Sequence, residues 1–217
     1  MCPSKSRNRR PRKKKSHTKT IILVVAVLAV IIGSIVVYSM TNNTSANEEQ
    51  QDETPELTQT KVLLETSMGN ITIQLRDDMP ITTGNFRNLV NEGVYDNTIF
   101  HRVIADFMIQ GGDPNGNGLS DDGIATIPDE FTDTNENNRG TIAMAKLGDS
   151  SGQPVENSAS SQFYINVVDI NGLDAGYSVF GDVISGMSVV DAISNVATDS
   201  NDRPLEDITL IKATLID

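Results

Sequence analysis

Residue types that often carry chemistry are rare in this sequence of 217 residues, which has no tryptophan, one cysteine and two histidines. The lone Cys2 excludes intrachain disulfides, zinc sites built from cysteines and a cysteine nucleophile in the folded part of the chain. His17 and His101 are too few for a multi-histidine metal centre. The sequence therefore favours a function that needs neither a metal nor a cofactor.

Basic residues are also scarce beyond position 20, where eight Lys/Arg stand against all 29 Asp/Glu and give a net charge of about −21. Nucleic-acid binding depends on Lys and Arg to neutralise phosphate charge. We therefore expect no nucleic-acid partner for this acidic part of the chain.

More than half of the basic residues lie at the N-terminus, where residues 1–20 hold nine Lys/Arg and no acid. Residues 21–40 follow as an almost wholly apolar, uncharged run, which spans roughly 30 Å as a helix and so crosses a bilayer. Because Lys and Arg stay on the cytoplasmic side, the sequence predicts a cytoplasmic tail over 1–20 and a single transmembrane signal anchor over 21–40, with the remainder outside the cell membrane.

A cleaved signal peptide is the competing interpretation of this run. Its apolar region is usually about 7–15 residues long, and a cleavage site of small residues should follow closely. Here the run is longer and the nearest candidate, residues 44–46, comes late. The basic tail could also be a nucleic-acid or nuclear-targeting segment, but next to a membrane span an orienting role is simpler.

Residues 41–60 are polar and acidic without apolar periodicity, which is typical of a flexible linker. Residues 61–217 are long enough to fold alone. Their pattern is mostly of period two, and Gly69 and Asn70 place a tight turn between two such runs, which predicts a β-hairpin over 62–75. Further short strands are expected over 98–104, 108–110, 140–146, 162–167, 179–183 and 208–215.

Two stretches look helical. Residues 80–92 begin with a proline at a first-turn position and place Phe86, Leu89 and Val90 on one face, and residues 187–196 carry a second apolar face. Many short strands with two helices predict a mainly β domain, either a sandwich or a closed barrel, with the helices covering it.

Sequence blocks now make the interpretation more specific. FHRVIADFMIQGGDPNGNG at 100–118 resembles the signature of the cyclophilins, which are peptidyl-prolyl cis-trans isomerases. The resemblance continues in family order through most of residues 61–217. The further blocks are NFRNLV (85–90), GTIAMAK (140–146), SSQFYI (160–165), GLDAGYSVFGDV (172–183) and DRPLEDITL (202–210). The resemblance implies a closed eight-stranded antiparallel barrel with two capping helices.

The reaction implied by the resemblance is rotation about a Xaa-Pro bond in polypeptide clients. No covalent bond is made or broken, so the site needs a surface that favours the twisted amide rather than a nucleophile. By resemblance the catalytic donor is Arg102. The substrate-binding residues implied in the same way are Phe107, Met108, Gln110, Ala145, Lys146, Gln162, Tyr164, Leu173 and Tyr177.

Strand parity supports part of this set, because Gln162 and Tyr164 share one strand face while Phe163 and Ile165 share the other. Phe163 is therefore expected in the core. Taken alone, Arg102 could be a solvated charge and Phe107 ordinary core, and the surrounding blocks favour the site.

Three positions depart from the family pattern. Many members carry a tryptophan where this chain has Gly172, and a histidine where it has Tyr177, although bacterial members often have tyrosine there. Lys146 replaces a commoner asparagine. The missing tryptophan predicts weak inhibition by cyclosporin, and Tyr177 favours a prokaryotic type.

Two other kinds of chemistry were weighed. Residues 113–118 fit the first half of a calcium-binding loop, but position twelve is Ile124 rather than glutamate. His101 could be drawn into a hydrolase triad, yet no nucleophile motif exists, so a structural, hydrogen-bonded histidine is expected.

The rival function is a non-catalytic module that binds proline-containing chains at the membrane, and in either case we expect a monomer.

Overall fold

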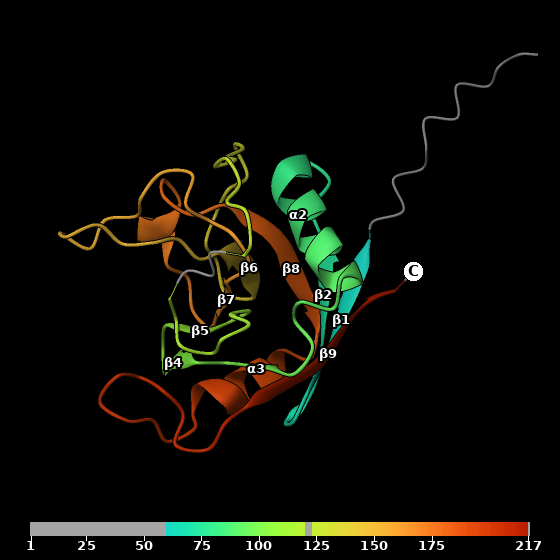
Figure 1. The fold of residues 1–217 in the computed structure, drawn as a ribbon, viewed down its shortest axis with the longest axis vertical. Helices are drawn as coiled ribbons and strands as arrows, with labels where there is room; N and C mark the ends of the chain where they lie inside the picture. The colour runs from blue at the N-terminus through green and yellow to red at the C-terminus, as the bar shows by residue number, and fades with distance from the viewer. Residues whose placement is uncertain (1–59, 120–122, 217) are drawn as a thin grey trace, which may run out of the picture. The chain divides into compact units, whose positions relative to one another are not determined.

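A computed structural model describes residues 60–119 and 123–216 of the chain (Figure 1). Within these ranges the structure has nine strands, two α-helices and one 3₁₀ helix. In chain order they are β1 (Lys61–Thr66), β2 (Gly69–Leu75), α2 (Pro80–Asn91), β3 (Thr98–Ile99), β4 (Arg102–Ile104), β5 (Met108–Gly111), β6 (Thr141–Met144), β7 (Phe163–Asn166), η1 (Asn171–Leu173), β8 (Val179–Ser185), α3 (Met187–Ser194) and β9 (Thr209–Ile216). The predicted hairpin and both predicted helices are confirmed, with ends that differ by one or two residues. The predicted turn position was wrong, because the turn lies at Ser67 and Met68 while Gly69 and Asn70 belong to β2.

All strands belong to one curled antiparallel sheet with the order β3-β9-β1-β2-β8-β6-β7-β5-β4. In Figure 1 α2 lies toward one end of the sheet and α3 toward the other. The mainly β class with two helices is therefore confirmed.

The sheet is a curled nine-stranded half-barrel rather than the expected closed eight-stranded barrel, and the strand predicted over 98–104 is two separate strands. β3 pairs with β9 at one edge of the sheet, whereas β4 pairs with β5 at the other edge. Phe100 and His101, both buried, lie between them. Within the described ranges the strand ladders leave β3 and β4 as the two sheet edges, and the chain itself joins them through these two residues.

The main core fills the inside of the curl. Period-two alternation sends Val62, Leu64, Ile71 and Ile73 inward from β1 and β2. Aromatic rings meet the helices there: the ring centroid of Phe86 in α2 lies 5.7 Å from that of Phe163, at an interplanar angle of 83°. Phe163 is fully buried, as strand parity predicts.

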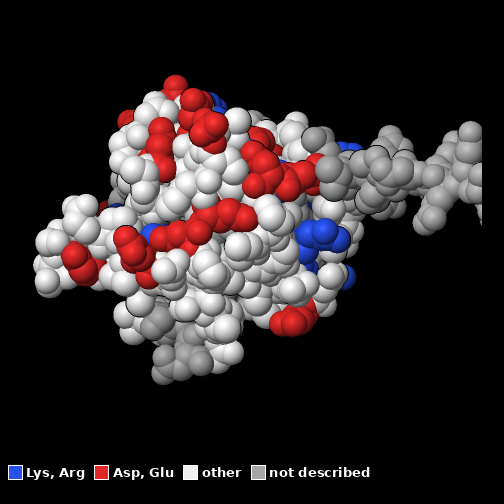
Figure 2. All heavy atoms as spheres, turned by 90° about the horizontal axis from the view of Figure 1, so that it is seen from above, with Lys and Arg blue, Asp and Glu red and all other residues white. Residues whose placement is uncertain are grey.

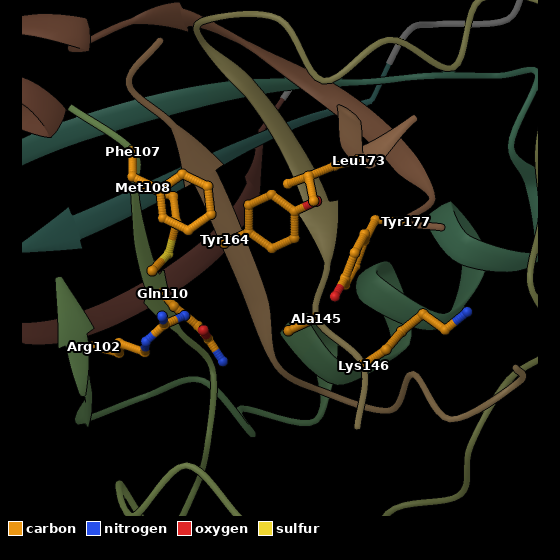
Figure 3. Close-up of a pocket in the computed structure, with 9 residues that line it drawn as sticks. All are labelled: Arg102, Phe107, Met108, Gln110, Ala145, Lys146, Tyr164, Leu173 and Tyr177. Atoms are coloured by element: carbon orange, nitrogen blue, oxygen red, sulfur yellow. The ribbon is translucent and has the colours of Figure 1, made fainter. Parts of the chain in front are cut away.

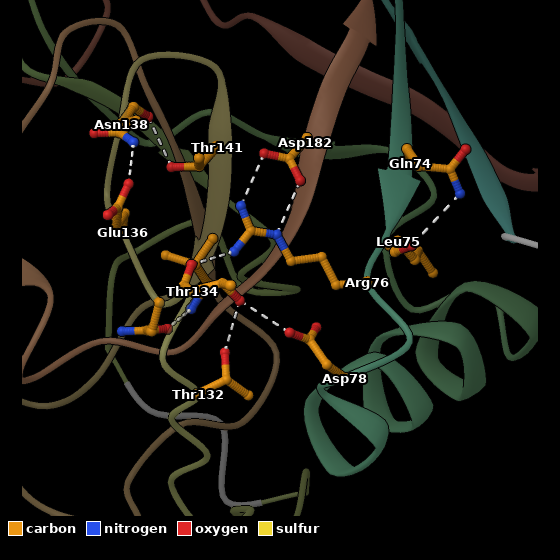
Figure 4. A network of polar contacts seen from close by, with 12 residues as sticks. Gln74, Leu75, Arg76, Asp78, Thr132, Thr134, Glu136, Asn138, Thr141 and Asp182 are labelled. Atoms are coloured by element: carbon orange, nitrogen blue, oxygen red, sulfur yellow. Dashed lines mark hydrogen bonds and ion pairs between the residues drawn. The ribbon is translucent and has the colours of Figure 1, made fainter.

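A polar network fastens β2 to β8 (Figure 4). The Arg76 guanidinium donates two hydrogen bonds to the Asp182 carboxylate, at 2.9 and 3.0 Å. Its Nη1 also donates to the carbonyl of Thr134, at 2.9 Å, and the Thr134 hydroxyl donates to Asp78. The loop around Thr134 is thus held against the sheet just before Asn135 and Asn137, which support the site described below.

In residues 60–119 and 123–216 no helix is long and apolar enough to cross a membrane. The predicted tail over 1–20, the predicted span over 21–40 and nearly all of the linker over 41–60 lie outside the described residues. The fold described here lies within one compact unit, Pro55–Asp217.

Candidate active site

One row of paired residues crosses four strands and builds the candidate site. Arg102 in β4 is the register partner of Gln110 in β5, which pairs with Tyr164 in β7, which pairs with Ala143 in β6. Directly opposed residues of a sheet point to the same face. The sheet therefore places the Arg102, Gln110 and Tyr164 side chains next to one another on the face opposite the main core, and Met108, two residues before Gln110, shares that face.

This face carries a small hydrophobic cluster of its own, separate from the main core. Met108, Ala143, Tyr164 and Val179 are buried in it, and five partly buried residues pack against them. These are Ile104, Phe107, Ala145, Leu173 and Tyr177. Strands thus bury both of their faces, one in the core and one beneath the site.

The cluster opens into a pocket of about 130 Å³ (Figure 3). Nine of the ten predicted site residues line it, namely Arg102, Phe107, Met108, Gln110, Ala145, Lys146, Tyr164, Leu173 and Tyr177. Pockets for drug-sized ligands are roughly 300–1,000 Å³, so this one suits a single side chain or ring. Gln162, the tenth, borders an adjoining hollow together with Gln110, Ala145 and Lys146.

Arg102 stands at the polar rim of this pocket with 43% of its side chain exposed. Its Nε lies 3.5 Å from the Asp202 carboxylate, which is equally exposed at 44%. A pair this long and this exposed to solvent contributes little to stability. The guanidinium is therefore available to a bound molecule.

A chain of amides continues the rim. Gln110 donates from Nε2 to Oε1 of Gln162, at 3.0 Å, and Gln162 donates from Nε2 to the carbonyl of Leu119, at 2.8 Å. These bonds fix which way both amides point. The backbone amide of Ala145 donates to the carbonyl of Gln162, at 2.9 Å. This bond keeps the backbone at Ala145 next to that of Gln162.

Two tyrosines form the apolar wall, and their rings meet edge to face with centroids 5.8 Å apart. The Tyr164 hydroxyl donates to Oδ1 of the fully buried Asn137, at 2.7 Å. Burial raises the pKa of Tyr164, and it also raises the pKa of Tyr177 against the opposing effect of Arg102. Both phenols are therefore neutral near pH 7.

Lys146 contributes to the pocket without turning its charge into it. Figure 3 shows its ammonium pointing away from the other lining residues. The ammonium pairs with the Asp129 carboxylate, and the two side chains are only 3% and 12% exposed. Lys146 is thus a wall of the pocket, with its charge neutralised inside the protein.

The sequence analysis did not identify the residues that support the two tyrosines of the pocket. Asn137 accepts from Tyr164 and takes Asp174 Oδ1 as acceptor for its backbone amide, at 2.6 Å. Asn135 donates to the carbonyls of Asp174 and Tyr177, at 2.6 and 3.0 Å. These two asparagines hold the segment that carries Leu173 and Tyr177. Their neighbourhood, TNENN, has only the composition of a turn, so no local signal distinguished them.

The Asp113 loop is explained without a metal. The Asp113 carboxylate is buried and accepts hydrogen bonds from the amides of Asn115, Asn117 and Gly118, at 2.7–2.9 Å. In the described part of the chain no group of three His, Cys, Asp or Glu side chains could hold a metal ion. Gly112 is required next to this loop, since an added Cβ would lie 2.7 Å from the Phe163 ring.

The expectation of a hydrogen-bonded His101 was wrong. The side chain is buried, but neither ring nitrogen has a partner. Burial lowers the pKa of His101, while Asp113 opposes that shift and Arg203 and Arg102 add to it. The imidazole is therefore neutral at pH 7 and acts as a packing group.

Comparison with known proteins identifies the family of this chain. Residues 61–215 match the family model of the cyclophilin-type peptidyl-prolyl cis-trans isomerases. The chain belongs to the cyclophilin family. It is accordingly a peptidyl-prolyl cis-trans isomerase, in agreement with the activity for which its relatives are named.

Cyclophilins similar to this chain come from several different organisms. A peptidyl-prolyl cis-trans isomerase of Schizosaccharomyces pombe is 41% identical over 161 residues, which cover 71% of this chain and 98% of the relative. One from Acinetobacter baylyi is 46% identical over 148 residues, covering 65% of this chain and 76% of the relative. A crystal structure of a Cryptosporidium parvum cyclophilin, determined in the presence of the dipeptide Ala-Pro, has a TM-score of 0.66 and 29% identity, and the match covers 72% of this chain and 99% of that one.

Proposed function

We propose that the pocket described above is where this cyclophilin isomerises Xaa-Pro bonds of polypeptide clients, with Arg102 as the catalytic residue. The observation that carries the proposal is the placement of one cationic donor beside a ring-sized apolar pocket on a rigid sheet. The pocket beside Arg203 also has an exposed guanidinium, but most of its lining residues are polar.

The physical demand of the reaction matches this arrangement. Amide resonance sets a barrier of about 18–20 kcal/mol, and the twisted state returns electron density to the prolyl nitrogen. A fixed cationic donor aimed at that nitrogen stabilises the twisted state more than either planar form. Arg102 has that role in the proposal, and no proton has to move between protein and substrate.

The remaining residues bind the client. Phe107, Met108, Tyr164, Leu173 and Tyr177 surround the proline ring with apolar surface. Gln110, Gln162 and the backbone at Ala145 and Lys146 hold the peptide on either side of it. Because the ring sits on buried side chains, the socket is preorganised and does not have to form when the client binds.

One experiment separates catalysis from mere binding of proline-containing chains. The full-length chain, at a concentration far below that of an Xaa-Pro peptide, should speed interconversion in both directions and leave the cis and trans populations unchanged. A binding module would instead shift those populations in proportion to the protein added. Unchanged interconversion at catalytic concentration would contradict the proposal.

We propose further that this is a membrane-anchored prokaryotic form, in which residues 21–40 tether a monomeric isomerase domain outside the cell membrane. The charge asymmetry around that run supports this orientation. One chain carries the whole pocket, which supports action as a monomer. There the enzyme would act on proteins that fold after export.

Protease added to intact cells or spheroplasts tests the orientation. It should remove residues 61–217 from the membrane fraction while a cytoplasmic marker stays intact. Protection of that domain until the cells are lysed would show that the orientation is wrong.

A further inference from the structure

A second hollow shares Lys146 with the proline pocket. Its volume is about 280 Å³, and its lining includes Asp129, Phe131, Lys146, Pro154, Glu156 and Gly176. Gly176 directly precedes Tyr177 of the proline pocket. An extended peptide advances about 3.3 Å per residue, so a residue a few positions from a bound proline reaches this hollow.

The hollow has one charged group without a partner, and it is negative. Glu156 is exposed, and within the described residues it makes no ion pair or hydrogen bond. The Lys146 side chain is only 3% exposed and its ammonium is paired with Asp129, so it does not repel a second cation strongly. The other oxygen of that carboxylate, Asp129 Oδ1, is buried and accepts no hydrogen bond.

Phe131 adds an aromatic surface to the same hollow. Phe131 is 46% exposed, although aromatic residues are usually well buried. The face of a phenyl ring attracts a cation, and its edge packs against the methylene stem of a long side chain. Pro154 closes the hollow beside it, since an added Cβ on Gly176 would lie 3.0 Å from the Pro154 ring.

We propose that this hollow is a second substrate subsite, which takes a lysine or arginine side chain of the client. Glu156 pairs with the cation, Phe131 contacts its stem and its charge, and the buried Lys146–Asp129 pair forms the wall shared with the proline pocket. Acidic side chains also predominate on the face shown in Figure 2, which favours approach of basic clients. The inference rests on the proposed function, because the occupant is part of the polypeptide whose proline is isomerised.

The test uses Xaa-Pro peptides that carry lysine, norleucine or glutamate at one position, scanned over the three residues on each side of the proline. With the full-length wild-type chain, lysine at one of these positions should raise kcat/KM about twofold to fivefold over norleucine, the range expected for an exposed ion pair with a cation–π contact. Glu156→Gln should remove this preference and leave kcat/KM for the norleucine peptide unchanged. Phe131→Leu should reduce the lysine preference.

Glu92→Gln is the matched control, because Glu92 is also exposed and unpaired but lines none of the described pockets. It should keep the lysine preference. If Glu156→Gln keeps the lysine preference, the preference comes from the overall negative charge of the domain. That result would overturn the subsite. Absence of any preference while the norleucine peptide is turned over would also overturn it, whereas no turnover of any peptide would contradict the proposed function itself.

Discussion

At the scale of single residues, Gly172 directly precedes Leu173, which lines the proline pocket. An added Cβ at this position meets no atom within 4 Å, so a large side chain has room there. Gly172→Trp should therefore fold, and it should strengthen inhibition by cyclosporin with little change in turnover. Inhibition constants for the two proteins measure this, and tight inhibition of the unaltered protein would show that residue 172 is not the position matching the family tryptophan.

His101 makes stability depend on pH. Burial lowers its pKa in the folded protein, so the unfolded chain binds a proton at higher pH than the folded chain does. The stability that His101 contributes is present above its unfolded pKa of about 6.5 and is lost as the pH falls toward the lower folded value. Asp113 opposes the shift, and Arg203 and Arg102 add to it.

We expect His101→Leu, which cannot titrate, to lose stability less steeply than the wild type between pH 7.5 and 5.5. Urea unfolding at several pH values measures the slope. Equal slopes for the two proteins would show that His101 stays accessible to protons in the folded state.

Residue patterns predicted the site better than they predicted its support. The family resemblance supplied Tyr164 as a site residue, and alternation along the strand then predicted that Phe163 points to the core, where it is fully buried. Asn137 and Asp129 act through contacts with residues 27 and 17 positions away, Tyr164 and Lys146. Such pairings follow from how loops fold back on the sheet, and no periodic signal in the sequence encodes them.

At the scale of elements, α2 receives its N-terminal cap from a distant loop. The N-cap residue Met79 makes no side-chain cap bond. Instead the Glu130 carboxylate accepts from the amides of Ile81 and Thr82, at 3.2 and 2.9 Å, and from the Thr82 hydroxyl at 2.9 Å. A carboxylate at a helix N-terminus satisfies free amides and interacts favourably with the helix dipole.

Glu130→Ala should lower the free energy of unfolding by about 1–2 kcal/mol, the usual cost of losing a helix cap. Glu92→Ala, at the other end of the same helix, should change it far less. Urea titrations of both variants give the comparison, and equal values would mean that Glu130 does not cap the helix.

Strand positions followed from period two, but the division of residues 98–104 did not. Both halves have the composition of a strand, and the sequence carries no glycine or proline between them. The chain passes from one sheet edge to the other at Phe100 and His101, because β3 pairs with β9 and β4 pairs with β5 in the curled sheet. That is a property of the whole sheet, which a local pattern cannot reveal.

At the scale of the whole molecule, the sequence joins an acidic isomerase domain to a basic N-terminal tail through an apolar run. The charge of about −21 over the residues beyond position 20 disfavours nucleic-acid binding and favours basic partners. The buried pocket cluster and the main core lie on opposite faces of the same strands, so the site is as rigid as the fold.

The central claim is that Arg102 supplies the electrostatic stabilisation of the twisted amide, and its direct test is the isomerisation rate of the Arg102→Ala protein. Loss of a charge-assisted hydrogen bond of about 1.5–3 kcal/mol should lower kcat/KM about tenfold to a hundredfold. The fold should persist, because the ion pair of Arg102 with Asp202 is long and exposed. Arg87→Ala, which removes an exposed and unpaired arginine from α2, should keep the wild-type rate. A folded Arg102→Ala protein that matches Arg87→Ala in kcat/KM would contradict the account.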